Sequence, residues 1–244
     1  MIAHPQIFIF YLPGMFGTLL ANSFMHHQLL INKNIESVEN NDKEGQGLNA
    51  HGGAYKDFIR HFHNKGERLF KRTKEENLKF FLPMENKPMG VHRLCDYKTS
   101  LFNFQEYFSN TVNIILFPKN KNDVEVYGHR SFYAATNADV SNDFFFPQFK
   151  KGAKNYPKYL IHGLGIKQRQ KFLLKYYEEM INDWPKIETK NIITFDPRDF
   201  NDLGKVQKLC DDTCNNLGIS KFKIPTNKIQ KHLDKNSKWF EMLK

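Results

Sequence analysis

Cysteine is scarce in this 244-residue chain, and long apolar runs are absent. The three cysteines, Cys95, Cys210 and Cys214, cannot all pair within the chain, and the last two lie one helical turn apart. We therefore expect reduced core thiols instead of a disulfide framework. No segment approaches the roughly 20 apolar residues that a membrane span requires.

A secretory leader is also not evident at the start of the sequence. The apolar segment there has no preceding Lys or Arg, and Pro13, Gly14 and Gly17 interrupt it. These features predict a protein of the reducing cytoplasm without a membrane span.

The sequence lacks a long block of like charge, although its formal net charge is +10. The excess comes from lysines scattered among asparagine and aromatic residues. Such a charge favours an anionic partner, which could be a nucleotide, a nucleic acid or an acidic glycan, but it also serves solubility alone. Both interpretations stay open.

Two common nucleotide-binding motifs are missing as well. The Walker pattern GxxxxGK[ST] requires a Lys before its Ser or Thr, whereas Gly17 precedes Thr18. The dinucleotide-binding pattern GxGxxG is absent too. An ATP-hydrolysing enzyme, a small-molecule kinase and a dinucleotide-dependent enzyme are all disfavoured.

What the sequence does contain is a strand, a glycine-marked turn and a helix at residues 6–29. Residues 7–11 (IFIFY) are apolar on both faces, as in a central parallel strand. The following turn and helix would present backbone N–H groups and the positive end of a helix dipole to one point. This arrangement predicts an anion site, and its alternative is a tight turn without a ligand.

The remaining segments indicate an α/β fold. Further strands are predicted at 89–94 (MGVHRL), 112–117 (VNIILF) and 191–195 (NIITF), and helices at 54–63, 74–81, 166–183, 203–217 and 226–243. Because strands and helices alternate, we predict a single domain over residues 1–244. Its architecture would be three-layered and similar to P-loop NTPases, with a mainly parallel central sheet between helices.

The segment YLPGMFGTLL, residues 11–20, resembles the first loop of the sulfotransferase family, and we call it the first loop. In that family the loop wraps the 5′-phosphosulfate of 3′-phosphoadenosine 5′-phosphosulfate (PAPS). Met15 and Phe16 stand where the family has a basic residue and a serine. The resemblance implies cofactor contacts from Pro13, Gly14, Met15, Phe16, Gly17, Thr18 and Leu19.

The segment MGVHRL is similar to the stretch that supplies the family's catalytic base, and the match falls on His92. A neutral imidazole with a pKa near 6.5 can take the proton of an attacking hydroxyl. Arg93 would add a cation near the developing charge. The alternative for His92 is a hydrogen-bonded structural residue.

The turn KNKND, residues 119–123, resembles the family's turn for the 3′-phosphate. Lys119 falls on the family's arginine and Asp123 on its aspartate. Tyr127 stands where the family has a serine, and Arg130 or Ser131 could substitute for that serine. A solvated turn is the alternative. Residues 184–220 resemble the family's late strand, helix and Leu-Gly-Ile ending, which supports the fold.

Together these segments imply transfer of a sulfuryl group from PAPS to a hydroxyl or amine of a small-molecule or glycan acceptor. Residues 45–53 and 144–158 are expected to shape the acceptor pocket. The alternative is a non-enzymatic relative that binds nucleic acid or an acidic glycan. We expect no metal, since His51, His61 and His63 lack partners that would complete a site.

Overall fold

The computed structural model describes a large part of the chain. The described residues are 1–11, 14–29, 71–81, 89–94, 102–127, 130, 171, 174–175, 177–178, 182, 191–234 and 236–243, with only the backbone for Phe80, Arg93 and Leu94. Pro13, residues 45–53, the predicted helix at 54–63 and the segment 144–158 lie outside them, as do Cys95, Ser131 and the three histidines weighed as metal ligands.

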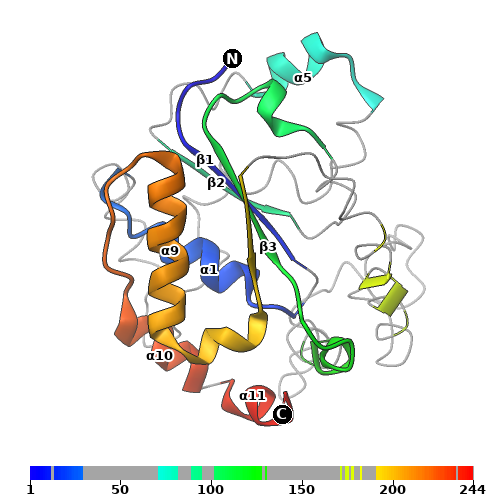
Figure 1. Cartoon of the computed structure of the whole chain (residues 1–244), viewed down its shortest axis with the longest axis vertical. Helices are drawn as coiled ribbons and strands as arrows, with labels where there is room; N and C mark the ends of the chain where they lie inside the picture. Colours follow the sequence, from blue (N-terminus) through cyan, green and yellow to red (C-terminus); the bar gives the residue numbers. More distant parts are fainter. Residues whose placement is uncertain are drawn as a thin grey trace, which may run out of the picture.

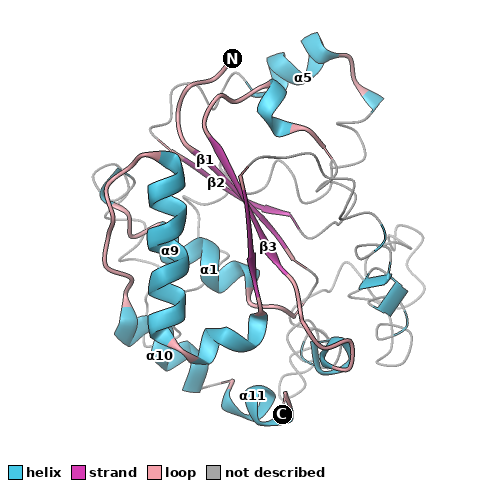
Figure 2. Cartoon of the chain, viewed as in Figure 1, coloured by secondary structure: helices cyan, strands magenta, loops and turns pink. Residues whose placement is uncertain are grey.

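A parallel sheet of four strands forms the centre of the described structure (Figure 2). Its order is β2-β1-β3-β4, with β1 at Gln6–Phe10, β2 at Gly90–Leu94, β3 at Thr111–Leu116 and β4 at Ile192–Phe195. Every residue of β1 and β3 is buried, as the apolar runs predicted. In register, Phe8 pairs with His92 on one side and Asn113 on the other.

Helices flank this sheet, which confirms the predicted α/β class. Helix α1 (Gly17–Phe24) and helix α9 (Leu203–Leu217) lie on the same side of the strands (Figure 1). Helix α5 (Lys74–Phe81) and the short 3₁₀ helix η4 (Phe104–Glu106) contribute aromatic rings that pack together beside β1. There Phe8 stacks on Phe104 with ring centroids 3.9 Å apart.

Helix α9 begins and ends where the sequence predicts. The side chain of Asp202 accepts hydrogen bonds from the backbone N–H groups of Gly204 and Lys205 at the start. Gly218 ends the helix with φ 65°, the left-handed conformation that favours glycine. Cys210 and Cys214 are buried on its inner face as free thiols, as expected.

The single helix predicted for 226–243 is wrong, because the structure contains two. Helix α10 spans Thr226–Asp234 and α11 spans Ser237–Met242. Between them, Asn236 Nδ2 donates a hydrogen bond to the carbonyl oxygen of His232 at 2.7 Å. This bond satisfies an end carbonyl of α10 and favours termination there.

The described residues of the predicted helix 166–183 are helical at positions 171, 174–175, 177–178 and 182. None of the helices in the described part of the chain has the length and apolar character needed to cross a membrane.

Candidate functional site

The first loop turns sharply between β1 and α1. Gly14 has φ 96° and Phe16 has φ 61°. Both residues thus have positive φ angles, which residues with a Cβ rarely adopt. Phe16 is the N-cap residue of α1 and makes no side-chain cap hydrogen bond. The first N–H groups of a helix have no partner within it, so the start of α1 retains the donors and dipole of an anion site.

Gly17 has a packing role in this loop in addition to any ligand role. A Cβ atom at this position would lie 2.2 Å from the ring of Tyr11. The glycine is therefore required by the close approach of an aromatic ring to the start of α1, whether or not a ligand binds there.

Three apolar side chains of the first loop belong to the core. Met15 is fully buried, and Phe16 and Leu19 are 3% and 2% exposed. Only their backbone groups could contact a ligand. Thr18 is partly exposed at the first turn of α1, so its hydroxyl is the loop side chain best placed for a phosphate oxygen.

Arg130 lies directly against this loop. Its Nη1 donates a hydrogen bond to the carbonyl oxygen of Gly14 at 2.6 Å, and its Cζ lies 3.7 Å from the centroid of the Phe16 ring. Its Nε also donates to Asn236 Oδ1 at 3.3 Å. Burial lowers the pKa of the guanidinium to about 10, so the group stays protonated at neutral pH.

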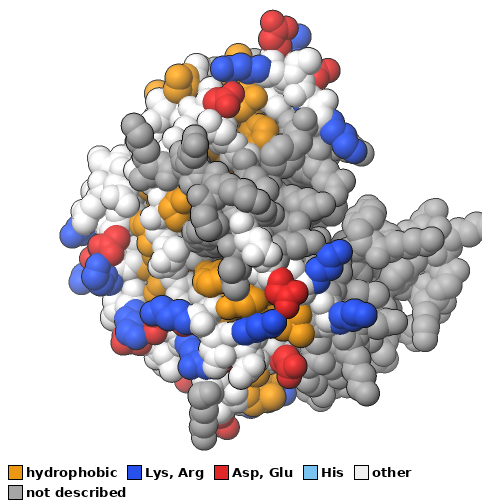
Figure 3. All heavy atoms as spheres, turned by 45° about the vertical axis from the view of Figure 1, so that its right-hand side comes forward, with side chains coloured by type: hydrophobic (Ala, Val, Ile, Leu, Met, Phe, Trp, Pro, Cys, Tyr) orange, Lys and Arg blue, Asp and Glu red, His pale blue; other side chains and the backbone are white. Residues whose placement is uncertain are grey.

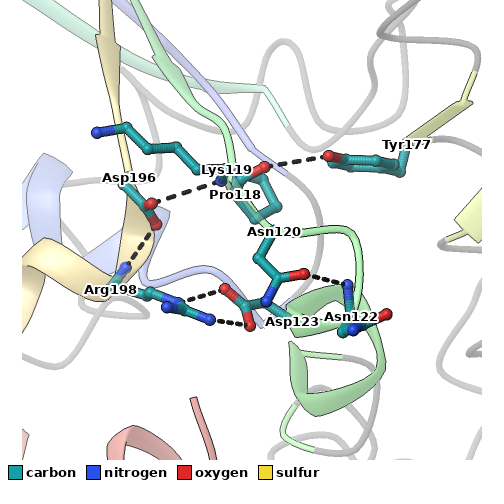
Figure 4. Close-up of polar contacts among 8 residues, drawn as sticks. All are labelled: Pro118, Lys119, Asn120, Asn122, Asp123, Tyr177, Asp196 and Arg198. Carbon is teal, nitrogen blue, oxygen red and sulfur yellow. Dashed lines mark hydrogen bonds and ion pairs between the residues drawn. The ribbon is translucent and has the colours of Figure 1, made fainter. Parts of the chain in front are cut away.

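A second cluster of polar groups forms where β3 and β4 end (Figure 4). The guanidinium of Arg198 donates twice to the Asp123 carboxylate, at 2.5 and 2.6 Å. Asp196 accepts hydrogen bonds from the backbone N–H of Arg198 at 3.0 Å and from that of Lys119 at 3.4 Å. These hydrogen bonds connect the turn after β3 to the turn after β4.

Lys119 follows β3 and is exposed. Figure 4 shows its side chain extending away from the Asp123–Arg198 pair. Since β1 and β3 are neighbouring parallel strands, the first loop and the KNKND turn lie at the same edge of the sheet. The structure thus brings together two of the segments that sequence reasoning assigned to one ligand.

Tyr127 is completely buried behind this turn. Its hydroxyl has no hydrogen-bond partner among the described residues. Burial is the largest cause that raises the pKa of this phenol, followed by the charges of Asp196 and Asp123, while Arg198 and Arg130 act in the opposite direction. The hydroxyl therefore stays protonated and is available as a donor.

His92 does not lie at the end of its strand, where a catalytic base was expected. Strand β2 continues to Leu94, and the His92 side chain is fully buried. Its Nε2 lies 2.7 Å from Gln6 Oε1, at the amino end of β1, and its ring stacks on Phe8. His92 itself pairs with Phe8, two residues or roughly 7 Å before the end of β1 that leads into the first loop, and its Nε2 points back toward Gln6 at the amino end of the strand.

Sequence reasoning did not single out Arg198, although it is the ion-pair partner of Asp123. The available signal was its position three residues after the end of a predicted strand, in the segment FDPRD. The Arg130–Gly14 contact joins residues far apart in the chain, and no local pattern could have indicated it. No group of three or more metal-binding side chains occurs among the residues that the structure describes.

Comparison with known proteins finds a partial similarity to a sulfotransferase. The chain is 32% identical over 121 residues to Sulfotransferase 2A6 of Mus musculus. The chain is related to a sulfotransferase over about half its length. The match covers 47% of this chain and 35% of the mouse protein, so the chain spans about a third of that relative. No family model matches the sequence, and no solved structure does.

Proposed function

We propose that this protein transfers a sulfuryl group from PAPS to a hydroxyl or amine of a small-molecule or glycan acceptor. The acceptor loses its proton as a new bond to sulfur forms and the bond between sulfur and the leaving phosphate oxygen breaks. The products are the sulfated acceptor and adenosine 3′,5′-bisphosphate. The similarity to the mouse sulfotransferase supports this reaction class.

The observation that carries the proposal is the meeting of the first loop and the KNKND turn at the carboxyl edge of adjacent strands. Ligands of open parallel sheets bind outside this edge. In the proposed complex, backbone N–H groups at the start of α1 and the Thr18 hydroxyl hold the 5′-phosphosulfate. Preorganised donors of this kind stabilise the negative charge that develops on the leaving group.

Lys119 is the cation that we assign to the 3′-phosphate. It is exposed, and its backbone is fixed by the hydrogen bond to Asp196. The neighbouring Asp123 carboxylate is neutralised by Arg198, so it does not repel a phosphate strongly. The Tyr127 hydroxyl is buried and has no partner in the described part of the chain, so it would have to become accessible to donate to the 3′-phosphate.

The geometry does not support the predicted role of His92 as general base. Its imidazole is fully buried and hydrogen-bonded to Gln6 at the opposite end of the strands from the first loop. We assign it a structural role in the sheet, where its imidazole links β2 to Gln6 of β1.

Titration calorimetry with adenosine 3′,5′-bisphosphate tests the proposal directly. We expect micromolar binding by the wild-type chain, and Lys119→Ala should weaken it about tenfold through loss of one charge-assisted contact. Lys223→Ala, at an exposed position after α9, is the matched control and should bind as wild type. No binding at high micromolar nucleotide would remove the hypothesis.

Heparin, tested in parallel, addresses the alternative of a polyanion-binding protein. Figure 3 shows acidic and basic side chains interspersed on the described part of one face, which does not favour a single-sign binding surface there. Tight heparin binding that weakens steeply with salt, without nucleotide binding, would establish the alternative.

A further inference from the structure

The contacts of Arg130 suggest a role different from the one that the sequence indicates. Family resemblance places this residue near the 3′-phosphate, beside Tyr127. In the structure, its guanidinium donates to the Gly14 carbonyl oxygen and covers the face of the Phe16 ring. Both contacts are with the loop for the 5′-phosphosulfate.

The hydrogen bond to Gly14 fixes the direction of a peptide unit. Because a trans peptide is planar, its N–H points opposite to its C=O. Holding the Gly14 oxygen on the Arg130 side therefore turns the N–H of Met15 away from Arg130. One guanidinium contact thus sets the orientation of a backbone donor in the first loop.

The contact between the Arg130 guanidinium and the Phe16 ring acts on the second residue of the first loop that has a positive φ. Phe16 adopts φ 61°, which is unfavourable for a residue with a Cβ and persists only when the surroundings hold it. The ring is held by Arg130 and also by Phe240 of α11, whose ring centroid lies 4.9 Å away in a stacked arrangement. Helix α1 begins at the next residue, so this position sets where its N-terminus points.

Arg130 is itself anchored from a third direction. Its Nε donates to Asn236 Oδ1, between α10 and α11. A guanidinium can donate in several directions of one plane while its face covers a ring, whereas a lysine ammonium cannot do both. The site therefore matches the geometry of arginine specifically.

We propose that Arg130 is a positioning residue of the first loop, which orients the backbone donors for the 5′-phosphate and does not bind the 3′-phosphate. This inference rests on the proposed function. It divides the cofactor contacts between two sets of residues, with Lys119 serving the 3′-phosphate and Arg130 acting on the 5′-phosphate through the loop.

Three probes separate these roles: adenosine 5′-monophosphate, adenosine 3′-monophosphate and adenosine 3′,5′-bisphosphate. Arg130→Ala should weaken the 5′-monophosphate and the bisphosphate by the same factor, about tenfold, and leave the 3′-monophosphate unchanged. Lys119→Ala should show the reverse pattern. Arg130→Lys should recover part of the loss, since it retains the charge and one donor.

A loss confined to ligands with a 3′-phosphate would overturn the inference, because it would place Arg130 at that group. An equal loss for all three ligands would also overturn it, since general damage to the fold does not distinguish phosphate positions. Both results are readable only if the wild-type chain binds these nucleotides.

If the wild-type chain binds none of the three nucleotides, the proposed function fails. Hydrogen exchange of the ligand-free protein then still tests the role of Arg130. Arg130→Ala should raise amide exchange over residues 14–20 at least tenfold relative to α9, whereas Lys119→Ala should not. Unchanged exchange in residues 14–20 would show that Arg130 does not hold the loop.

Discussion

At the scale of single residues, the Tyr127 hydroxyl is a buried donor without a partner in the described structure. Removing it as Tyr127→Phe should leave the free energy of unfolding unchanged or slightly higher. If the hydroxyl donates to the nucleotide, the affinity for adenosine 3′,5′-bisphosphate should fall about fivefold to tenfold. Denaturation and calorimetry on the same samples measure both effects.

Tyr177→Phe is the matched control for that experiment, because the Tyr177 hydroxyl donates to the Pro118 carbonyl oxygen at 3.3 Å. It should lose stability and retain nucleotide affinity. If Tyr127→Phe behaved in the same way, the Tyr127 hydroxyl would have a structural partner instead of a ligand.

His92 gives a second prediction at this scale. His92→Ala should lower the free energy of unfolding by roughly 2–4 kcal/mol, because it leaves a cavity beside Phe8 and removes the partner of the buried Gln6 oxygen. His4→Ala, at an exposed position, should have little effect. Unaltered stability of the His92 variant with loss of sulfuryl transfer would instead restore its assignment as the base.

At the scale of elements, helix α9 depends on its left-handed end at Gly218. A Cβ at Gly218 would meet nothing within 4 Å, so the cost of Gly218→Ala is conformational alone. We expect a loss of about 1 kcal/mol in urea denaturation. Gly218→Asn should lose less, because asparagine tolerates this conformation, and equal losses for the two variants would contradict the explanation.

The bounds of the helices and strands show which features of the fold the sequence could predict and which it could not. Helix α9 has the predicted bounds and the buried strands lie within a residue of theirs, because caps and apolar runs are local signals. The break at Asn236 was missed, since a helix-like pattern continues through it and the interruption depends on a side-chain bond. The sequence left His92 open between a catalytic base and a hydrogen-bonded structural residue, because Gln6 becomes its neighbour only through strand pairing.

At the scale of the whole molecule, the buried thiols of α9 should make the free energy of unfolding fall as the pH rises through the alkaline range. Burial is the main cause that raises the pKa of Cys214 to about 11 and that of Cys210 well above its ordinary value. In the unfolded chain these thiols ionise near their ordinary pKa of 9.0. The unfolded state therefore releases protons first, and stability should fall as pH rises from about 9 to 11.

Urea midpoints at pH 7.5, 9 and 10.5 measure this decline. The double variant Cys210→Ala with Cys214→Ala should be less stable at pH 7.5 but should decline less steeply. Tyr127 also has a raised pKa, so part of the slope should persist in that variant. An identical slope in both proteins would exclude the thiols as its source.

The strand order also has a consequence for how the chain is made. Strand β1 precedes β2 and β3 in the sequence but lies between them, and the residues that pair with it begin at positions 90 and 111. Its apolar side chains and unpaired backbone groups must therefore leave the ribosome long before either hydrogen-bonding neighbour exists. Because pairing between distant segments is slow and exposes strand edges, the nascent chain should need protection by chaperones until β3 has emerged.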